Sequence, residues 1–159
     1  MLNPSYHPFM GFDRQQSPSY LVSQLTKEFA RALQARASGL GFSAGQFPIL
    51  VELWEEDGLT QKQLLERVDV EQATMANTLS RMERDGLIER KPHPKDRRAQ
   101  LVFLTPKAHD IKDGAISAMC AADDVLMQGL KRFEKELMLE FMRNALDNIR
   151  TLDKSDRNC

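Results

Sequence analysis

One segment near the middle of the chain constrains the fold more than any other. Residues 90–105 read RKPHPKDRRAQLVFLT, and five of the first nine are basic: Arg90, Lys91, Lys95, Arg97 and Arg98. Only Asp96 opposes these charges. Behind them, residues 99–104 alternate, as a β-strand does when successive side chains point to opposite faces. The segment therefore predicts a basic loop followed by a strand.

The residues before the loop complete a hairpin. Residues 87–92, LIERKP, also have the period of a short strand, and Pro92 and Pro94 bracket the loop between the two strands. We expect a hairpin over residues 87–105 that holds the loop of residues 93–98 away from the body of the protein.

Four helices are predicted before the hairpin, because apolar residues recur there every three or four positions. Ser43 is an expected N-cap for the second, Thr60 and Gln63 have capping-box spacing for the short third, and Gly86 follows the fourth. The expected apolar faces are Leu21, Leu25, Phe29, Ala32 and Leu33 in the first helix, which Gly39 and Gly41 stop; Phe47, Leu50, Val51 and Trp54 in the second; and Met75, Leu79 and Met82 in the fourth.

Two more helices are predicted after the hairpin. Thr105 and Pro106 have the pattern of an N-cap and a first helical residue. They open one long helix, which Gly129 weakens or breaks. The apolar stripes are Ile111, Ala115, Met119, Ala122 and Leu126 in the long helix, and Leu130, Phe133, Leu137, Phe141, Leu146 and Ile149 in the last.

This order predicts a mainly α fold with a small β-hairpin wing: a winged helix-turn-helix plus a helical dimerisation region. We expect an irregular N-terminal arm at 1–17, the first dimerisation helix at 18–42, a DNA-binding domain at 43–105 with its wing at 87–105, C-terminal dimerisation helices at 106–152 and a polar tail at 153–159. The outer helices carry more apolar surface than so small a unit covers, so we expect a homodimer.

The charge is unevenly distributed along the chain. The net charge is −1, but residues 81–107 carry +4 and the rest carries −5. A basic region in an acidic chain is typical of a site for a polyanion, although a solvated basic loop gives the same count. No apolar run has the length of a membrane span, and no signal-peptide pattern begins the chain. Two cysteines, Cys120 and Cys159, fit a reducing cytoplasm.

Residues 59–108, LTQKQLLERVDVEQATMANTLSRMERDGLIERKPHPKDRRAQLVFLTPKA, resemble the DNA-binding core of the MarR/SlyA family of bacterial transcription regulators. The most specific parts are DRR at residues 96–98 and the strand that ends in LTPKA; VEQATMANTL is most similar to the SlyA branch. The resemblance implies a homodimeric regulator, expected to be a repressor, whose winged helices read two halves of a pseudo-palindromic duplex. It also implies release by a small molecule, commonly an aromatic acid, bound between the dimerisation and DNA-binding parts.

The fourth helix is expected to lie in the major groove. Its exposed face carries side chains that offer hydrogen-bond donors and acceptors to base edges: Gln72, Thr74, Asn77, Thr78 and Arg81. Relatives often carry Arg where Asn77 stands, so this sequence departs from the family pattern there, and the resemblance does not carry over the preferred bases. The alternative for Gln72 and Thr74 is that they cap the helix.

The resemblance places Asp96 and Arg98 at the tip of the wing. Arg98 is expected to enter the minor groove, where narrow A·T-rich stretches concentrate negative potential, and Asp96 to accept a hydrogen bond from its guanidinium. The alternative is a surface salt bridge worth at most about 1 kcal/mol. Phosphate contacts, which position without specifying sequence, are assigned to six residues: Lys91, Lys95, Arg97, Thr60, Gln61 and Lys62.

The sequence gives a weaker signal for the effector site than for the DNA contacts. Tyr20, Phe47, Trp54 and Met119 are candidates to line a pocket, although apolar residues at helical spacing are more often core. Arg31 or Arg36 is a candidate partner for an effector carboxylate. Cys120 is expected to be packed, and its neighbours Asp123 and Asp124 disfavour a reactive thiolate, which argues against redox sensing.

An enzyme is not predicted. His7, His93 and His109 are scattered, and the sequence has no metal-ligand spacing, phosphate-binding glycine loop or nucleophile elbow. No cofactor is expected. Two other functions keep the same fold: a winged-helix module for protein interaction, and a nucleoid-type DNA binder that needs no ligand.

Overall fold

The computed structural model describes the backbone of residues 13–156 and the side chains of residues 13–151. It forms two compact units, residues 1–122 and 123–159. Most of the expected N-terminal arm and Cys159 lie outside the described residues. Within them, Ser17 caps α1 (Pro18–Arg36) after the short turn η2 (Arg14–Gln16).

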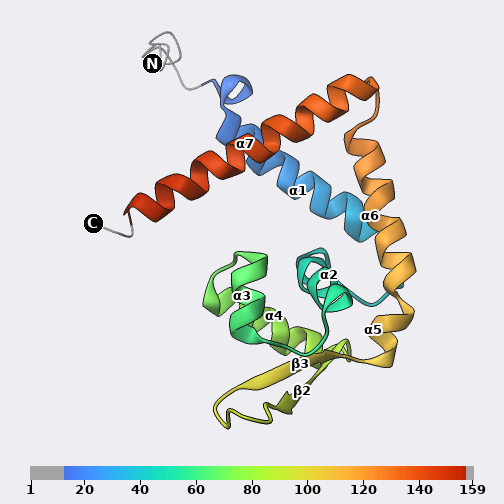
Figure 1. Cartoon of the computed structure of the whole chain (residues 1–159). Coiled ribbons are helices and arrows are strands. Elements are labelled where there is room, and N and C mark those ends of the chain that lie inside the picture. Colours follow the sequence, from blue (N-terminus) through green and yellow to red (C-terminus); the bar gives the residue numbers. More distant parts are fainter. Residues whose placement is uncertain (1–12, 157–159) are drawn as a thin grey trace. The chain divides into compact units, whose positions relative to one another are not determined.

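The winged helix-turn-helix lies within the first unit (Figure 1). It contains η3 (Ala44–Gln46), α2 (Phe47–Glu55), β1 (Leu59–Thr60), α3 (Gln61–Val68), α4 (Gln72–Arg84), β2 (Ile88–Pro92) and β3 (Gln100–Leu104). The predicted capping box of Thr60 and Gln63 is confirmed, as is Gly86 after α4, with φ of +71°. The predicted buried face of α4 is also confirmed, since Met75, Leu79 and Met82 are each 0 % exposed.

The sheet has one strand more than the predicted hairpin. β2 and β3 are antiparallel, with Ile88 opposite Leu104 and Arg90 opposite Val102. The two-residue strand β1 pairs with the other edge of β3, so the order is β1-β3-β2. β1 is too short for an alternating pattern to appear in the sequence. The sheet buries Leu59, Ile88, Val102 and Leu104 against the helices.

The helix before the helix-turn-helix differs from the prediction in detail. Ser43 caps the turn η3, which leads directly into α2. α2 buries Phe47 and Leu50 as expected, and it also buries Ile49 and Leu53, which are four positions apart. Val51 and Trp54, which were expected on the buried face, are only half-buried. The face toward the core is therefore rotated from the predicted one.

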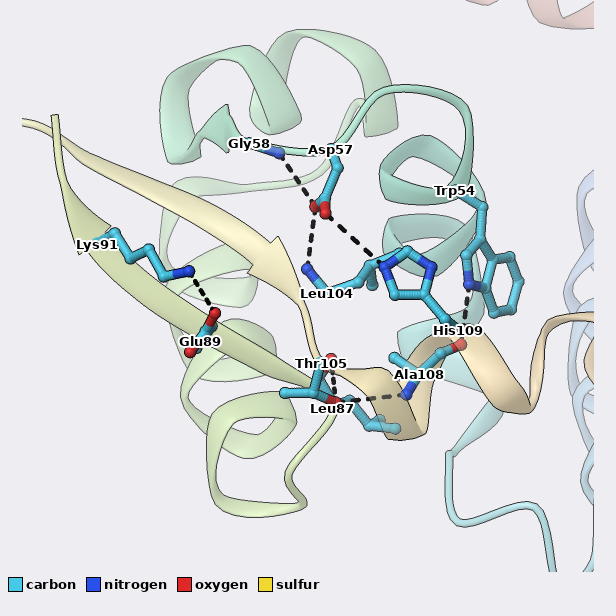
Figure 2. A network of polar contacts seen from close by, with 10 residues as sticks. All are labelled: Trp54, Asp57, Gly58, Leu87, Glu89, Lys91, Leu104, Thr105, Ala108 and His109. Carbon is cyan, nitrogen blue, oxygen red and sulfur yellow. Dashed lines mark hydrogen bonds and ion pairs between the residues drawn. The ribbon is translucent and has the colours of Figure 1, made fainter. Parts of the chain in front are cut away.

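The long helix predicted from Thr105 is two helices, α5 (Pro106–Asp110) and α6 (Lys112–Leu126), with Thr105 as the N-cap. The indole N–H of Trp54 donates to the Ala108 carbonyl at 3.0 Å (Figure 2). This hydrogen bond ties α5 to α2 three residues before the interruption at Ile111. Cys120, expected to be packed, is exposed on α6.

The second unit contains the end of α6 and α7 (Arg132–Asp156). Gly129, with φ of +84°, separates the two helices as predicted, and Leu130 precedes α7 rather than belonging to it. Large apolar side chains on α7 are exposed: Phe133, Leu137, Leu139, Phe141, Leu146 and Ile149.

Candidate nucleic-acid interface

The turn between α3 and α4 sets the direction of the second helix. α3 ends at Asp69, which adopts a left-handed conformation with φ of +55°. Aspartate tolerates this conformation better than most residues, because its short polar side chain bonds locally. Leu64 of α3 is fully buried with α4's apolar face. The packing leaves the opposite face of α4 free for a ligand.

The exposed face of α4 carries the predicted base-reading residues. Gln72, Thr74, Asn77 and Arg81 are exposed, and Thr78 is half-buried. The Thr78 hydroxyl donates to the Thr74 carbonyl at 2.8 Å, which leaves its oxygen as an acceptor. Glu71 occupies the N-cap position, so the alternative that Gln72 or Thr74 caps the helix is wrong.

The tip of the wing is built by its own hydrogen bonds. The His93 ring accepts at Nδ1 from the backbone amides of Lys95 at 3.2 Å and Asp96 at 3.0 Å. The His93 amide donates to the Ala99 carbonyl, which closes the loop at its base. Nδ1 can accept a hydrogen bond only in the neutral imidazole tautomer that carries its proton on Nε2. A side chain thus gives the loop a defined shape.

Asp96 shapes the same loop in a way that differs from the prediction. Its carboxylate accepts from the backbone amide of Arg98 at 2.9 Å, and not from the guanidinium. Its carbonyl accepts from the Ala99 amide at 3.1 Å. Asp96 therefore fixes the backbone beneath Arg98, whose exposed side chain keeps its donors for a partner.

A groove of about 530 Å³ joins the wing to the start of α3. Five of the predicted contact residues line it: Thr60, Gln61, Lys62, Asp96 and Arg98. They come from segments some forty residues apart in the chain, and the pairing of β1 with β3 brings them together. The groove therefore unites the predicted phosphate contacts of α3 with the predicted minor-groove contact of the wing.

The remaining wing bases lie in different surroundings. Lys95 and Arg97 are exposed in the loop. The ammonium of Lys91 pairs with Glu89 at 2.6 Å and lies 4.9 Å from the centre of the Phe103 ring. Lys91 and Arg90 point to opposite faces of β2 because they are adjacent in a strand. Arg90, not Lys91, lines the groove.

The junction between α4 and β2 is held from two sides. Gln46 is 3 % exposed, and its amide nitrogen donates to the Asp85 carboxylate at 2.9 Å. Lys107 of α5 donates to the Asp85 carbonyl at 2.7 Å. The hydrogen bond from Gln46 and the neighbouring Arg84 guanidinium lower the pKa of the Asp85 carboxyl below its ordinary value. The charged carboxylate is thus the form that the fold stabilises.

The four candidate effector residues are not brought to a single cavity among those described. Phe47 and Trp54 are ring neighbours, 6.1 Å apart and nearly perpendicular. Met119 packs against the core, and the Tyr20 hydroxyl accepts from Gln24. An open groove of about 750 Å³ lies elsewhere, at the end of α1, and Arg31 lines it together with Phe42, Gln46 and Asp85. Arg36 donates to the Ala32 carbonyl of its own helix.

Two residues of the interface were missed by the sequence analysis. His93 was considered only as a possible metal ligand or catalytic group, although its place between two prolines marks a constrained loop. Arg90 was counted only as a charge. Its phase in β2 is that of the buried Ile88, and that phase was the signal that it faces inward.

Other classes of site are not evident in the described residues. Among residues 13–151, no group of three or more His, Cys, Asp or Glu side chains is arranged to hold a metal ion. No helix in this part of the chain is both long and apolar enough to cross a membrane.

Comparison with known proteins agrees with this geometry. The sequence profile of the MarR family matches residues 42–99. The transcriptional regulator HosA of Escherichia coli O111:H- is 29% identical over 102 residues, which cover 64% of this chain and 76% of that protein.

Solved structures share the fold. The regulator PcaV of Streptomyces coelicolor, solved with its natural ligand, matches with a TM-score of 0.78 at 24% identity, over 86% of this chain and 96% of that one. A MarR family regulator of Listeria monocytogenes, solved in complex with 26mer DNA, matches with a TM-score of 0.74 at 20% identity, over 84% of this chain and 89% of that one. Residues 42–99 therefore form a MarR family domain, and the chain has the winged-helix fold of MarR family transcriptional regulators.

Proposed function

We propose that the chain binds a pseudo-palindromic duplex as a cytoplasmic homodimer and represses transcription. In each half-site, α4 lies in the major groove with Asn77 and Arg81 toward base edges, and the wing places Arg98 in the minor groove. The observation that carries the proposal is the groove that joins Thr60 to Arg98 beside a mostly neutral, hydrogen-bonding face of α4.

The division of the chain into parts follows from the same proposal. Residues 43–105 form the DNA-binding domain, and residues 18–42 and 106–152 form the dimerisation region. The exposed apolar side chains of α7 support this, because a monomer rarely leaves so many large ones in contact with water. A second copy is the partner that the proposal assigns to them.

Release by a small aromatic acid is the third part of the proposal. PcaV is a structural relative solved with a natural ligand, which supports a ligand-responsive fold. Tyr20, Phe47, Trp54 and Met119 stay the proposed effector contacts, although they line neither of the two grooves described above. Arg31 is the better of the two candidate partners for a carboxylate, because it lines an open groove whereas Arg36 bonds its own helix.

The experiment that tests the proposal is selection of binding sites from a random duplex pool, followed by titration of the winner against salt. A palindromic winner with half-site centres about one helical turn apart is the expected result. Its affinity should fall steeply with salt, as counterions leave the bound phosphates. Weak, salt-sensitive binding to every duplex would instead support the nucleoid-type binder. Absence of binding at any salt would favour the protein-interaction module.

A further inference from the structure

Arg90 occupies an unusual place in the wing. It lies on β2, opposite Val102 of β3, on the face of the hairpin that turns toward the helices. Its side chain is 23 % exposed. The other residues of β2 on that face are the buried Ile88 and the strand-terminal Pro92. A charged side chain in this position requires a partner, because burial without one is costly.

The partner belongs to α4. Arg90 Nε lies 3.4 Å from a carboxylate oxygen of Glu83, whose side chain is 48 % exposed. Nε itself is buried and has no hydrogen bond of good geometry among the described residues. Buried donors are normally satisfied, so an ion pair that stops short of a hydrogen bond is a feature to explain.

The pair completes the attachment of the wing to α4. At the root of the hairpin, the Leu87 amide donates to the Met82 carbonyl at 2.9 Å, and the Thr105 hydroxyl donates to the Gly86 carbonyl at 2.7 Å. These bonds fix one end of a two-stranded arm. Arg90 adds a second point of attachment farther along it, three residues beyond Leu87. Two separated points resist bending of the arm, as one point does not.

We propose that the Arg90–Glu83 ion pair is a strut that fixes the wing relative to α4, with Arg90 as a positioning residue for DNA recognition. The proposal rests on the proposed function, because α4 and the wing must reach the major and minor grooves together. Arg90 lines the groove that DNA would cover. Displacement of water from this groove strengthens the attraction between the two charges, so binding tightens the strut.

A double-mutant cycle tests the strut. Glu83→Gln, Arg90→Gln and the double variant are titrated with the selected duplex at matched salt. Each single variant should bind about three- to tenfold more weakly, and the double variant no more weakly than the weaker single one, since all three lack the same pair. The exchanged pair Glu83→Arg with Arg90→Glu should recover part of the loss.

Glu89→Gln is the matched control. Like Glu83→Gln, it removes one negative charge from this region. It also breaks an ion pair of β2, because Glu89 lies 2.6 Å from Lys91 on the face of the strand that points away from α4. It should leave affinity unchanged or raise it slightly, because a repulsive charge is lost. Footprints should show weaker protection by the wing in the Glu83 and Arg90 variants, with protection by α4 retained. Melting temperatures within a few degrees of wild type would separate this effect from loss of the fold.

Two results would overturn the strut. In the first, Arg90→Gln weakens binding and lowers the slope of log affinity against log salt concentration by about one, while Glu83→Gln behaves like the control Glu89→Gln. Arg90 would then contact a phosphate directly. In the second, neither variant differs from the control. If wild type selects no duplex, the proposed function fails and the strut is judged on amide hydrogen exchange of residues 93–99, which should accelerate in both single variants and not in the control.

Discussion

At the scale of single residues, the proposed recognition of DNA is divided between a neutral amide and a charged guanidinium. Asn77 is exposed in the middle of α4, where its carboxamide offers a donor and an acceptor side by side, the pattern that pairs with adenine. Arg98 is exposed in the wing, on backbone fixed by Asp96. In the proposed complex, Asn77 reads a base edge and Arg98 reads the shape of the minor groove, so we expect their loss to have different consequences.

We predict that Asn77→Ala relaxes base preference at one symmetric pair of positions in the operator. The remaining phosphate contacts keep the register, so affinity for unrelated duplexes stays unchanged. Site selection with wild type, Asn77→Ala and the control Ser80→Ala, on the same helix, measures the effect. A profile for Asn77→Ala that matches wild type would remove Asn77 from the readout.

Arg98→Ala should weaken specific binding by about 1–3 kcal/mol without unfolding the protein. Arg97→Ala, at the next position, removes the same charge, but the contact that it removes is the proposed one with a phosphate. It should therefore weaken binding to all duplexes alike. Affinities for a selected and an unrelated duplex at matched salt measure the difference. An unchanged specific affinity for Arg98→Ala would be incompatible with the proposed role of the wing.

Gly58 is the residue at which backbone geometry limits substitution most. Its φ is +76°, and an added Cβ would lie 2.7 Å from the Phe103 ring. Gly58→Ala should destabilise the fold by about 1–3 kcal/mol more than Gly39→Ala, which shares the positive φ but has nothing within 4 Å of the added atom. Urea unfolding of both variants makes the comparison, and equal losses would mean that Phe103 moves freely aside.

At the scale of elements, the joints between helices and sheet hold the interface together. Asp57 accepts at one carboxylate oxygen from the amides of Gly58 and Leu104, and its other oxygen lies 3.9 Å from the His109 ring of α5 (Figure 2). The end of α2, the end of β3 and the last turn of α5 thus meet at one side chain. Gln46 and Lys107 meet in a similar way at Asp85, where α4 gives way to β2.

The Asp85 joint predicts a pH dependence of stability. Its carboxyl pKa is lowered in the folded state, first by the hydrogen bond from Gln46 and then by Arg84. A lowered pKa contributes stability that is fully present above the pKa of the unfolded chain and is lost as pH falls through the folded pKa. Asp85→Asn should therefore be less stable than wild type at neutral pH, and the difference should shrink as pH falls below about 4. Urea unfolding at pH 7 and pH 3 measures it; a difference independent of pH would contradict the assignment.

At the scale of the whole molecule, the exposed apolar side chains of α7 are the surface that the proposed dimer would cover. Phe141 is 59% exposed and Ile149 is 61% exposed. Covering such side chains is worth about 25 cal/mol for each Å² of apolar surface removed from water. The proposed homodimer would remove this surface from water and would space two DNA-binding domains for two half-sites.

Phe141→Glu should convert the dimer to a monomer, since it places a charge in a surface that would be dry. Arg143→Glu introduces the same side chain two residues away without removing an apolar one, and should remain dimeric. Sedimentation at several concentrations distinguishes the two, and the monomer should bind the palindromic duplex far more weakly. A wild type that sediments as a monomer would refute the dimer, and the two-half-site geometry with it.

The sequence by itself determined the elements whose signals are local. The capping box of Thr60 and Gln63, the stop at Gly86 and the buried face of Met75, Leu79 and Met82 each depend on residues within a few positions of one another. The two strands of the hairpin could be predicted for the same reason, because the alternating pattern and the prolines that bracket the loop lie within one segment. The candidate site could be predicted to the extent that its residues fall on such elements, as Gln72, Asn77 and Arg98 do.

Only the tertiary structure decided the features that join distant segments. β1 exists because β3 offers it an edge, and the helix after Thr105 is tied to α2 where Trp54 donates to Ala108, 54 residues away. Whether Arg90 is a free charge or half of an ion pair with Glu83 depends on how β2 lies against α4. Periodicity shows which face of an element is apolar, but a contact depends on where another element places its side chains. The groove between α3 and the wing is therefore a property of the fold and not of any segment that lines it.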